Sequence, residues 1–544
     1  MKIIKFRNKF TKARYPLRKR LCIYLSNRLL ELSATLPKFQ GGLIARLQTI
    51  DEHRKTATFS VARPNDVNIE FLYLWIFETF LIGESEELRQ GLQSLFDDFS
   101  KSRYIIPRKV EQGDIDEIFK KMGESLLGLS WHRIGLIDIL GNKDKVKSKR
   151  NWIEHFDLCV HHHSPSFVTV SFGVEPTIAF KNIVRNAILQ DIPHRVEFKF
   201  PKSLKRLKLW FTFPAYSKLY SPHVKRELIE NLMLEFKFEA VEIISRYLKG
   251  FFVRSGAPMP NIELFVENSS ASQEADSIES ESEKKSLFFW DSLGMNKRDF
   301  GYFKSEQGDI GIFLIDRHTE NVIDKPFKLL IDKRKIVENL KSSDDIDARI
   351  IYDSGYYVEA LTPILITKEI LQLMLRENMS INKLLLNKAS FKQSFLDIYT
   401  FKKLISLKQK INNLHLPFKR ILLEFEADWI RTEAKATGLP RLINNLRIDK
   451  QNNKNDFLTV VIDKIKFETK VAKENFEFIN TAVNELLQAE TVESNYKIQR
   501  RILYLTIVIA LLTVITALPE EMRGMLFSYF TESYREIIRQ LIKK

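Results

Sequence analysis

The feature that most constrains this chain is an apolar run from Ile502 to Leu518, seventeen residues without a charged side chain. As an α-helix the run would extend roughly 25 Å, close to the ~30 Å hydrocarbon core of a bilayer. We therefore predict a transmembrane helix at 502–518, whose membrane-facing residues are Ile502, Leu505, Ile509, Leu512, Ile515 and Leu518. The alternative interpretation is a helix buried in a soluble core.

The charged flanks of this run predict its orientation. Lys497, Arg500 and Arg501 precede it, whereas Glu520 and Glu521 follow Pro519. Retained Lys and Arg mark the cytoplasmic side of a membrane helix. We therefore expect a single-pass membrane protein with the bulk of the chain in the cytoplasm; the sequence does not distinguish an organellar from a bacterial membrane.

A long helix is predicted to lead into the membrane. No proline lies between Pro440 and Pro519, and no glycine lies between Gly438 and Gly524. Within this stretch apolar positions recur at alternating spacings of four and three, the pattern of a coiled-coil seam. The seam consists of Leu458, Ile462, Ile465, Thr469, Ala472, Phe476, Ile479, Val483 and Leu486. It predicts a helical stalk over 457–501 that either associates with other copies of the chain or packs on its own domain.

The segment 519–544 after the apolar run also has a helical pattern. One stripe is apolar and consists of Leu526, Phe527, Phe530, Tyr534, Ile537, Ile538, Leu541 and Ile542. Because charged residues occupy much of the remaining surface, we expect an amphipathic helix that lies in the membrane interface or packs on a partner.

The end of the chain resembles the C-terminal region of the CorA family of divalent-metal channels. The similar residues are Leu505-Thr506-Ile507 and Leu512-Thr513-Val514-Ile515-Thr516, within about the last ninety residues. The resemblance implies a long cytosolic helix that continues into an oligomeric membrane module. The family's Gly-Met-Asn signature does not follow the apolar run, where Gly524-Met525-Leu526 stands instead, and a second membrane helix is missing. A Gly-Met-Asn string does occur, but at Gly294-Met295-Asn296, far before the run.

Before the stalk, the sequence predicts α+β domains on both sides of an acidic, serine-rich segment at 268–285. The expected regions are an N-terminal domain at 1–267 and a second, α/β to helical region at 286–440. Helices are expected at 68–99, 228–252 and 368–408, and the apolar stretch Phe71–Ile82 is expected to be a core helix. Strands are expected at 166–174, 195–200, 206–213, 310–315 and 349–361.

The densest group of reactive side chains lies between Glu154 and His163. If this segment is a strand, one face carries His155, Asp157, Cys159, His161 and His163, because side chains alternate along a strand. Imidazole, carboxylate and thiolate groups are ligands for zinc or another divalent metal. The alternative is a helix with Trp152, Phe156 and Val160 on one face, in which histidines near the C-terminus are favoured by the helix dipole.

Basic residues form two further candidates for binding. Residues 1–20 contain nine Lys and Arg and no acidic residue, and the chain carries a net charge of +16. A second cluster places Lys202, Lys205, Arg206 and Lys208 among Leu207, Leu209, Trp210 and Phe211. Either segment is suited to nucleic acid, anionic lipid or another anionic ligand, and either is equally explained as a solvated basic surface.

No nucleophile elbow and no phosphate-binding glycine loop occur in the sequence, and we assign no catalytic residue. The sequence therefore favours a non-enzymatic, membrane-anchored sensor or binding protein over an enzyme. Its cytosolic domains would act through the stalk on the bilayer, as an oligomeric effector that forms a pore or disrupts the membrane. In architecture alone, this design resembles membrane effectors of bacterial defence systems. The alternative is a tail-anchored enzyme or nucleic-acid-binding protein in which the membrane helix is a simple anchor.

Overall fold

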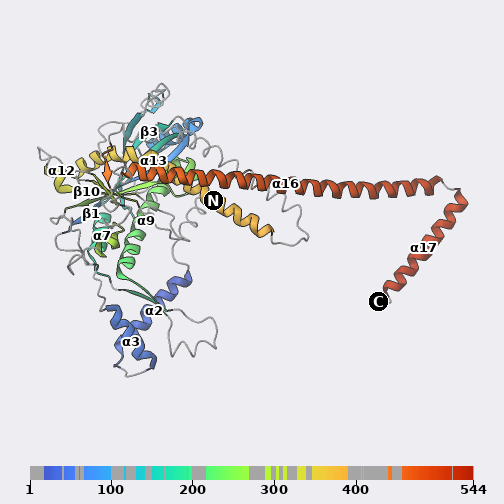
Figure 1. Ribbon diagram of the computed structural model, residues 1–544, viewed down its shortest axis with the longest axis horizontal. Coiled ribbons are helices and arrows are strands. Elements are labelled where there is room, and N and C mark those ends of the chain that lie inside the picture. The colour runs from blue at the N-terminus through green and yellow to red at the C-terminus, as the bar shows by residue number, and fades with distance from the viewer. Residues whose placement is uncertain are drawn as a thin grey trace, which may run out of the picture. The chain divides into compact units, whose positions relative to one another are not determined.

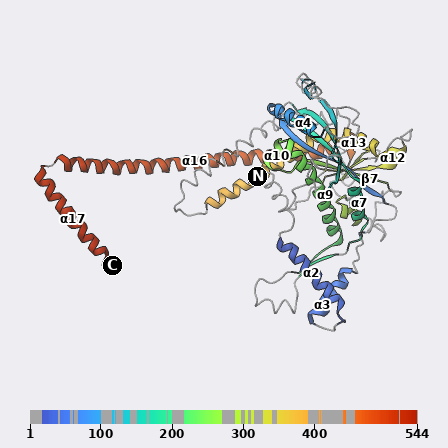
Figure 2. The ribbon, with the colours of Figure 1, turned by 180° about the vertical axis from the view of Figure 1, so that it is seen from behind.

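The fold is described from a computed structural model of the 544-residue chain (Figures 1 and 2). The structure describes residues 17–38, 42–55, 61, 67–99, 115–117, 120, 130–140, 150–164, 167–192, 194–198, 216–268, 288–295, 302–305, 310–314, 327–338, 346–389, 406, 409, 439–443, 456–517 and 519–542. The acidic segment at 268–285, apart from Asn268, and the predicted strand at 206–213 lie outside these residues.

A nine-stranded mixed sheet forms the centre of the larger part of the chain. Its strands follow the order β11-β8-β9-β10-β7-β1-β4-β3-β2. Neighbouring strands are antiparallel except β10 and β7, which are parallel. The strands are β1 Ile69–Leu81, β2 Ser130–Asp138, β3 Ile153–Ser164, β4 Phe167–Pro176, β7 Asn261–Glu267, β8 Tyr302–Ser305, β9 Ile310–Leu314, β10 Phe327–Asp332 and β11 Leu442–Ile443. A separate pair consists of β5 Arg195–Phe198 and β6 Tyr216–Leu219.

Helices account for most of the remaining described structure. They are α2 Leu17–Thr35, α3 Gly42–Lys55, α4 Ser85–Phe99, α7 Ile178–Leu189, α9 Ser221–Tyr247, α10 Phe251–Ser255, α12 Lys333–Glu338, α13 Ile346–Ala389, α16 Phe457–Ala517 and α17 Glu520–Ile542, with a 3-10 turn at Ile82–Glu84. The predicted mixture of α and β structure is confirmed. The segments expected to be strands at 166–174, 195–200 and 310–315 correspond to β4, β5 and β9.

The predicted core helix at Phe71–Ile82 is wrong, because this segment is the central strand β1. From Phe71 to Phe80 every residue of β1 is buried. A strand covered on both faces carries apolar side chains at successive positions rather than at alternate ones, and such a run does not differ in periodicity from a buried helix. The expected helix at 68–99 therefore begins only with α4, at Ser85.

The predicted strand at 349–361 is also wrong, because these residues belong to the 44-residue helix α13. The buried positions Ile350, Ser354, Val358, Leu361 and Leu365 follow one another at spacings of three and four. This is the period of a helix face, and the β-branched and aromatic residues between those positions do not override it.

The sheet extends across the boundary predicted at 268–285. Strand β7 ends at Glu267 and pairs in parallel with β10, whose residues Phe327–Asp332 follow the acidic segment in sequence. Parallel neighbours require a long crossover connection, and the acidic segment lies within that connection. The regions expected before and after it therefore contribute to the same sheet.

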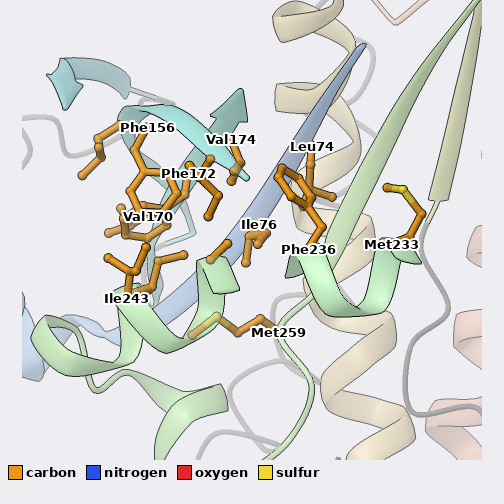
Figure 3. Packing of buried hydrophobic residues seen from close by; sticks show 14 of the residues in the cluster. Leu74, Ile76, Phe156, Val170, Phe172, Val174, Met233, Phe236, Ile243 and Met259 are labelled. Atoms are coloured by element: carbon orange, nitrogen blue, oxygen red, sulfur yellow. The ribbon is translucent and has the colours of Figure 1, made fainter. Parts of the chain in front are cut away.

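A large apolar core lies between α9 and the strands β1, β3 and β4 (Figure 3). Figure 3 shows Phe156, Val170 and Phe172 grouped on the side of the strands near Ile243 of α9. At the edge of this core Thr177 caps α7, accepting a hydrogen bond from the backbone N–H of Phe180 at 3.4 Å. This packing fixes which face of β3 and β4 is apolar, and hence which face remains for polar groups.

The other face of the sheet is covered at β8–β10 by α13 and the start of α16. The Lys368 ammonium lies 5.0 Å from the centre of the Phe327 ring of β10. The Phe457 ring packs edge-on against Phe303 of β8, with 5.3 Å between ring centres. Asp456 caps α16 by accepting hydrogen bonds from the backbone N–H and the hydroxyl of Thr459, both at 3.2 Å.

The chain divides into two compact units. The first contains residues 1–374 and 417–470, and the second contains 375–416 and 471–544. Helices α13 and α16 each contribute to both units. Apart from residues 406 and 409, the described residues of the second unit belong to the end of α13, most of α16, and the region of α17.

Candidate functional site

Helix α16 has a buried beginning and an exposed end. Of the nine predicted seam positions, seven are buried within the single chain: Leu458, Ile462, Ile465, Ala472, Phe476, Ile479 and Val483. Thr469 is half-buried, and the side chain of Leu486 lies outside the described set. The periodicity thus corresponds to a face buried by the chain itself, the second of the two interpretations that the seam allows.

Continuing the same register past Leu486 gives Glu490, Glu493, Lys497 and Arg500. The apolar stripe therefore ends about where burial ends. Charged side chains at these positions do not form the packed apolar seam that holds coiled-coil helices together. The part of α16 between the buried face and the apolar run is a polar helix segment.

One helix segment is long and apolar enough to cross a membrane, among the residues that the structure describes. It covers Asn495–Ala517, 23 residues with a mean hydropathy of 1.8, and none of its most apolar stretch is buried in the chain. The predicted membrane residues Ile502, Leu505, Ile509 and Leu512 are exposed, Ile515 is half-exposed, and Leu518 lies outside the described residues. At ~1.5 Å per residue the segment is about 34 Å long, enough to span a bilayer core.

The hydroxyl groups in this segment are satisfied within the helix. Thr506 donates to the carbonyl oxygen of Ile502 at 2.8 Å, and Thr513 donates to that of Ile509 at 2.8 Å. A hydroxyl without a partner is costly in hydrocarbon, so these bonds make both threonines compatible with a lipid environment. The helix ends at Ala517, shortly before Pro519, a residue that cannot donate a helix hydrogen bond.

Helix α17 begins directly after Pro519, and its predicted amphipathic pattern falls on a 23-residue helix. Phe527, Phe530 and Tyr534 of the apolar stripe are exposed, as are Met522 and Met525. The side chains of Leu526, Ile537, Ile538, Leu541 and Ile542 lie outside the described set. The described apolar residues of α17 are thus more than half exposed.

The second candidate site is a polar face of the sheet at β3. The segment from Glu154 to His163 is part of a strand and not a helix. Phe156, Leu158 and Val160 are buried in the core, so His155, Asp157, Cys159 and His161 lie on the opposite face. The strand interpretation of this sequence is therefore correct; the His163 side chain lies outside the described set.

Residues from neighbouring strands complete this face. The guanidinium Nε of Arg133 on β2 donates to Oδ1 of Asp157 at 2.7 Å. The imidazole Nε2 of His161 and the hydroxyl of Ser171 on β4 are hydrogen-bonded at 2.6 Å. Tyr73 of β1 lies against Gly173 of β4, where a Cβ atom would stand 2.4 Å from the phenolic oxygen.

Burial keeps His161 and Cys159 of this face in their neutral forms. It lowers the pKa of the His161 imidazole to about 3. The pKa of the Cys159 thiol rises to about 12 through burial and the nearby Asp157 charge. Burial also raises the pKa of Glu359 of α13, which acts on Cys159, to about 7. At neutral pH Cys159 is a thiol rather than the thiolate that attacks an electrophile or binds a metal.

The described members of the predicted metal site, His155, Asp157, Cys159 and His161, do not converge in this arrangement. Among the described residues, no three side chains of His, Cys, Asp or Glu are grouped closely enough to hold a metal ion. Asp157 is paired with Arg133, and His161 with Ser171. His161 and Ser171 are both almost fully buried, and so are out of reach of a substrate. The face is organised as a hydrogen-bonded polar layer, and a metal site that includes His163 remains a prediction.

The Gly-Met-Asn string has a structural role at its first two residues. Gly294 follows a short helix and has φ of 67°, a left-handed conformation that favours glycine. The N–H of Met295 donates to the carbonyl oxygen of Trp290 at 3.0 Å, and the Met295 side chain is fully buried. This geometry ends a helix within the core.

Sequence reasoning missed the partners on the neighbouring strands and one buried acid. Glu78 of β1 is fully buried, and it accepts hydrogen bonds from the backbone N–H groups of Phe252 and Val253 at 2.9 and 3.0 Å. Burial raises its pKa to about 7, against the effect of these bonds. The only sequence signal for this buried acid was its position as a single charged residue within the apolar stretch Phe71–Ile82. Arg133, Ser171 and Tyr73 had no local signal, because strand pairing alone brings them to β3.

Comparison of the chain with protein-family models, with curated proteins and with solved structures finds no match. The functional argument therefore depends on the geometry described above.

Proposed function

We propose that the chain is a membrane-anchored protein in which an α+β body acts on a bilayer through α16. The body senses or binds a ligand, and the segment Asn495–Ala517 crosses the membrane. Assembly of several copies would allow the single spanning helices to form a pore or to disrupt the bilayer. The resemblance of the segment to the membrane region of CorA channels agrees with such a module.

One observation carries the proposal. A single uninterrupted helix begins in the buried core of the α+β body and ends in an apolar segment that is exposed. α16 begins at Phe457, which is fully buried, and continues to Ala517, at the end of a segment of which no part is buried among the described residues. A helix is rigid along its axis, so that displacement of its buried beginning shifts its far end as well. An apolar helix of this length exposed to water is unfavourable, and insertion into lipid removes that cost.

The charges around the segment support the orientation predicted from the sequence. Lys497, Arg500 and Arg501 precede the most apolar part, and Glu520 and Glu521 follow it. With this bias the body and the buried part of α16 would lie on the cytoplasmic side, and α17 on the other side. The apolar residues of α17 would then rest in the outer interface.

Two measurements test the proposal. Purified protein in detergent should be oligomeric, and its reconstitution into liposomes should release a trapped dye or give a conductance. A monomeric protein that leaves the liposomes sealed would exclude a pore.

Deletion of 497–544 separates this function from simple anchoring. If the segment only anchors the protein to a membrane, the truncated soluble protein should keep the ligand binding, or any enzymatic activity, of the α+β body. Loss of all function in a truncated protein with an unchanged circular dichroism spectrum would exclude the anchor interpretation.

A further inference from the structure

A small substructure of the first unit lies apart from the main sheet. Helices α2 and α3 pack together and against the β5–β6 pair (Figures 1 and 2). Leu30 of α2, Leu47 of α3, and Val196 and Phe198 of β5 form its core. The backbone N–H of Phe198 donates to the hydroxyl of Ser26 at 2.9 Å, which fixes α2 on the edge of β5.

Two basic segments of the sequence adjoin this substructure along the chain. Residues 1–20, which lead into α2, contain nine basic and no acidic residues. Residues 195–220, which begin with β5 and end just after β6, contain seven basic residues and one acidic residue. Together they carry a charge of +15, nine from the first segment and six from the second, against +16 for the whole chain. Most of these basic residues lie in 1–16 and 199–215, outside the described residues, and Lys218 of β6 is one of those that the structure describes. A basic sequence on either side of β5 and β6 is complementary to a polyanion.

The β6 strand presents aromatic rings to solvent beside a cation. Tyr216 and Tyr220 are each close to half exposed. The ammonium group of Lys218 lies 5.7 Å from the centre of the Tyr220 ring. His194 holds the start of α9 next to this ring, because its Nδ1 accepts a hydrogen bond from the Ser221 N–H at 2.8 Å.

An open depression of about 340 Å³ continues this surface along α9. Ile192, Val224 and Leu228 give it apolar walls, and Gln190 and Asn231 place amide groups at it. Arg195, the first residue of β5, and Glu227 of α9 also line it, and their side chains form an ion pair at 2.7 Å. In the β5–β6 register Arg195 lies opposite Leu219, the residue between Lys218 and Tyr220. Apolar walls with amide groups suit a flat heterocycle whose edge carries hydrogen-bond donors and acceptors.

We propose that β6, the start of α9 and this depression form a binding surface for single-stranded nucleic acid. Two bases stack on the rings of Tyr216 and Tyr220, and the Lys218 ammonium binds the phosphate that links their nucleotides. A further base enters the depression. Proteins that bind single-stranded nucleic acid without strong sequence preference use aromatic side chains next to Lys or Arg. A duplex keeps its bases stacked on one another and offers no ring face to these tyrosines.

The chemistry of β6 favours this occupant over an anionic membrane. The exposed residues of the strand are Tyr216, Ser217 and Lys218. Anchoring in lipid depends on the apolar area that enters the membrane. The only large aliphatic side chain of this strand is Leu219, and it is already half-buried in the protein.

The experiment uses the full chain in detergent and fluorescein-labelled RNA and DNA single strands of about twelve nucleotides, within the usual site size. Fluorescence anisotropy should show saturable binding that weakens between about 50 and 200 mM salt. Tyr216→Ala should weaken binding roughly 5- to 150-fold, the range for loss of one stacked base. Tyr216→Phe, which keeps the ring, should bind within about twofold of the wild type.

Two further variants make the result specific. Lys218→Gln should reduce the slope of log affinity against log salt by about 0.7, the contribution of one phosphate contact in a single strand. Tyr352→Ala removes an equally exposed tyrosine from α13 and should leave binding unchanged.

The proposal is wrong if Tyr216→Ala binds the oligonucleotide as the wild type does, or if Tyr352→Ala loses as much affinity. It is also wrong if a duplex of the same sequence binds as tightly as the single strand. Soluble dihexanoyl-phosphatidylglycerol tests the lipid alternative: weaker binding of this lipid by Tyr216→Ala, with unchanged oligonucleotide binding, would assign the surface to lipid. None of these outcomes depends on whether α16 forms a pore.

Discussion

Replacement of Ile509 by arginine distinguishes a membrane helix from an exposed soluble helix. Ile509 lies in the middle of the apolar run and is 54% exposed in the isolated chain. If the segment spans a bilayer, an arginine at its centre costs about 2.5 to 3.5 kcal/mol and the lost isoleucine a further ~0.5 kcal/mol. The total of about 3 to 4 kcal/mol lowers the insertion equilibrium roughly 150- to 900-fold. In a helix that remains in water, the same exposed substitution changes stability by only about 0.5 kcal/mol.

The assay is flotation of in vitro translated protein with liposomes, followed by alkaline carbonate extraction. The wild type should float and resist extraction, whereas the Ile509→Arg protein should remain in the soluble fraction. Val492→Arg is the matched control, because Val492 is exposed on the same helix but lies before the segment Asn495–Ala517. Equal flotation of the Ile509→Arg and Val492→Arg proteins would refute the membrane assignment.

Three further predictions concern the buried parts of the chain. Ile479→Ala should lower the unfolding free energy by about 2 to 5 kcal/mol at every protein concentration, because Ile479 is fully buried within one chain, whereas the exposed neighbour Phe478→Ala should have little effect. The folded-state pKa of His161 lies near 3, against about 6.5 in the unfolded chain. As the pH falls from 7 to 5, protonation of the unfolded chain should therefore lower the free energy of unfolding by about 2 kcal/mol. His161→Asn should abolish this loss. The pKa of Glu78 is raised to about 7, so this group affects stability in the opposite direction: the folded chain holds its proton more tightly than the unfolded chain. Its contribution to the free energy of unfolding is present at low pH and falls by about 2.5 kcal/mol from pH 5 to 8. Glu78→Gln should remove this fall.

Thermal unfolding in detergent measures all three predictions. A melting temperature that rises with protein concentration, together with dissociation of the oligomer by Ile479→Ala, would show that the seam binds another copy. An unchanged acid dependence in His161→Asn would mean that solvent reaches this imidazole. For Glu78→Gln, a stability difference from the wild type that stays constant from pH 5 to 8 would mean that the carboxyl is ionised throughout.

Sequence patterns predicted the chain best where a single period was unopposed. α16 followed from a heptad pattern and the absence of proline and glycine. At β3 the alternating side chains gave a strand only as one of two interpretations, because Trp152, Phe156 and Val160 also fit one face of a helix. The pattern failed at β1, because burial on both faces removes the alternation that distinguishes a strand. It failed at 349–361 because β-branched residues and tyrosines there are compatible with a helix once every third or fourth residue is buried.

The side-chain groupings were less predictable, because their members come from distant elements. Glu263 of β7 is buried beside the Lys237 ammonium of α9, at 2.7 Å, and that of Lys328 on β10, at 3.8 Å. None of these three residues is unusual in its own segment. The pairing of Arg133 with Asp157 likewise depends on the register of β2 against β3, which includes a bulge between Arg133 and Gly135. A bulge shifts which side chains face each other, and no local sequence signal marked this one.

The charges after the seam limit how α16 can act in the proposed function. In parallel copies aligned at the same register, each of Glu490, Glu493, Lys497 and Arg500 would face its own counterpart, and like charges repel. This part of α16 therefore opposes a parallel coiled coil between copies, and contacts between copies would have to form in the membrane or through the body. The buried face from Leu458 to Val483 then serves to hold α16 in its own chain. In the proposed function, a ligand that changes this packing would move the apolar segment as a continuation of the same helix, and a signal would reach the bilayer without a separate stalk assembly.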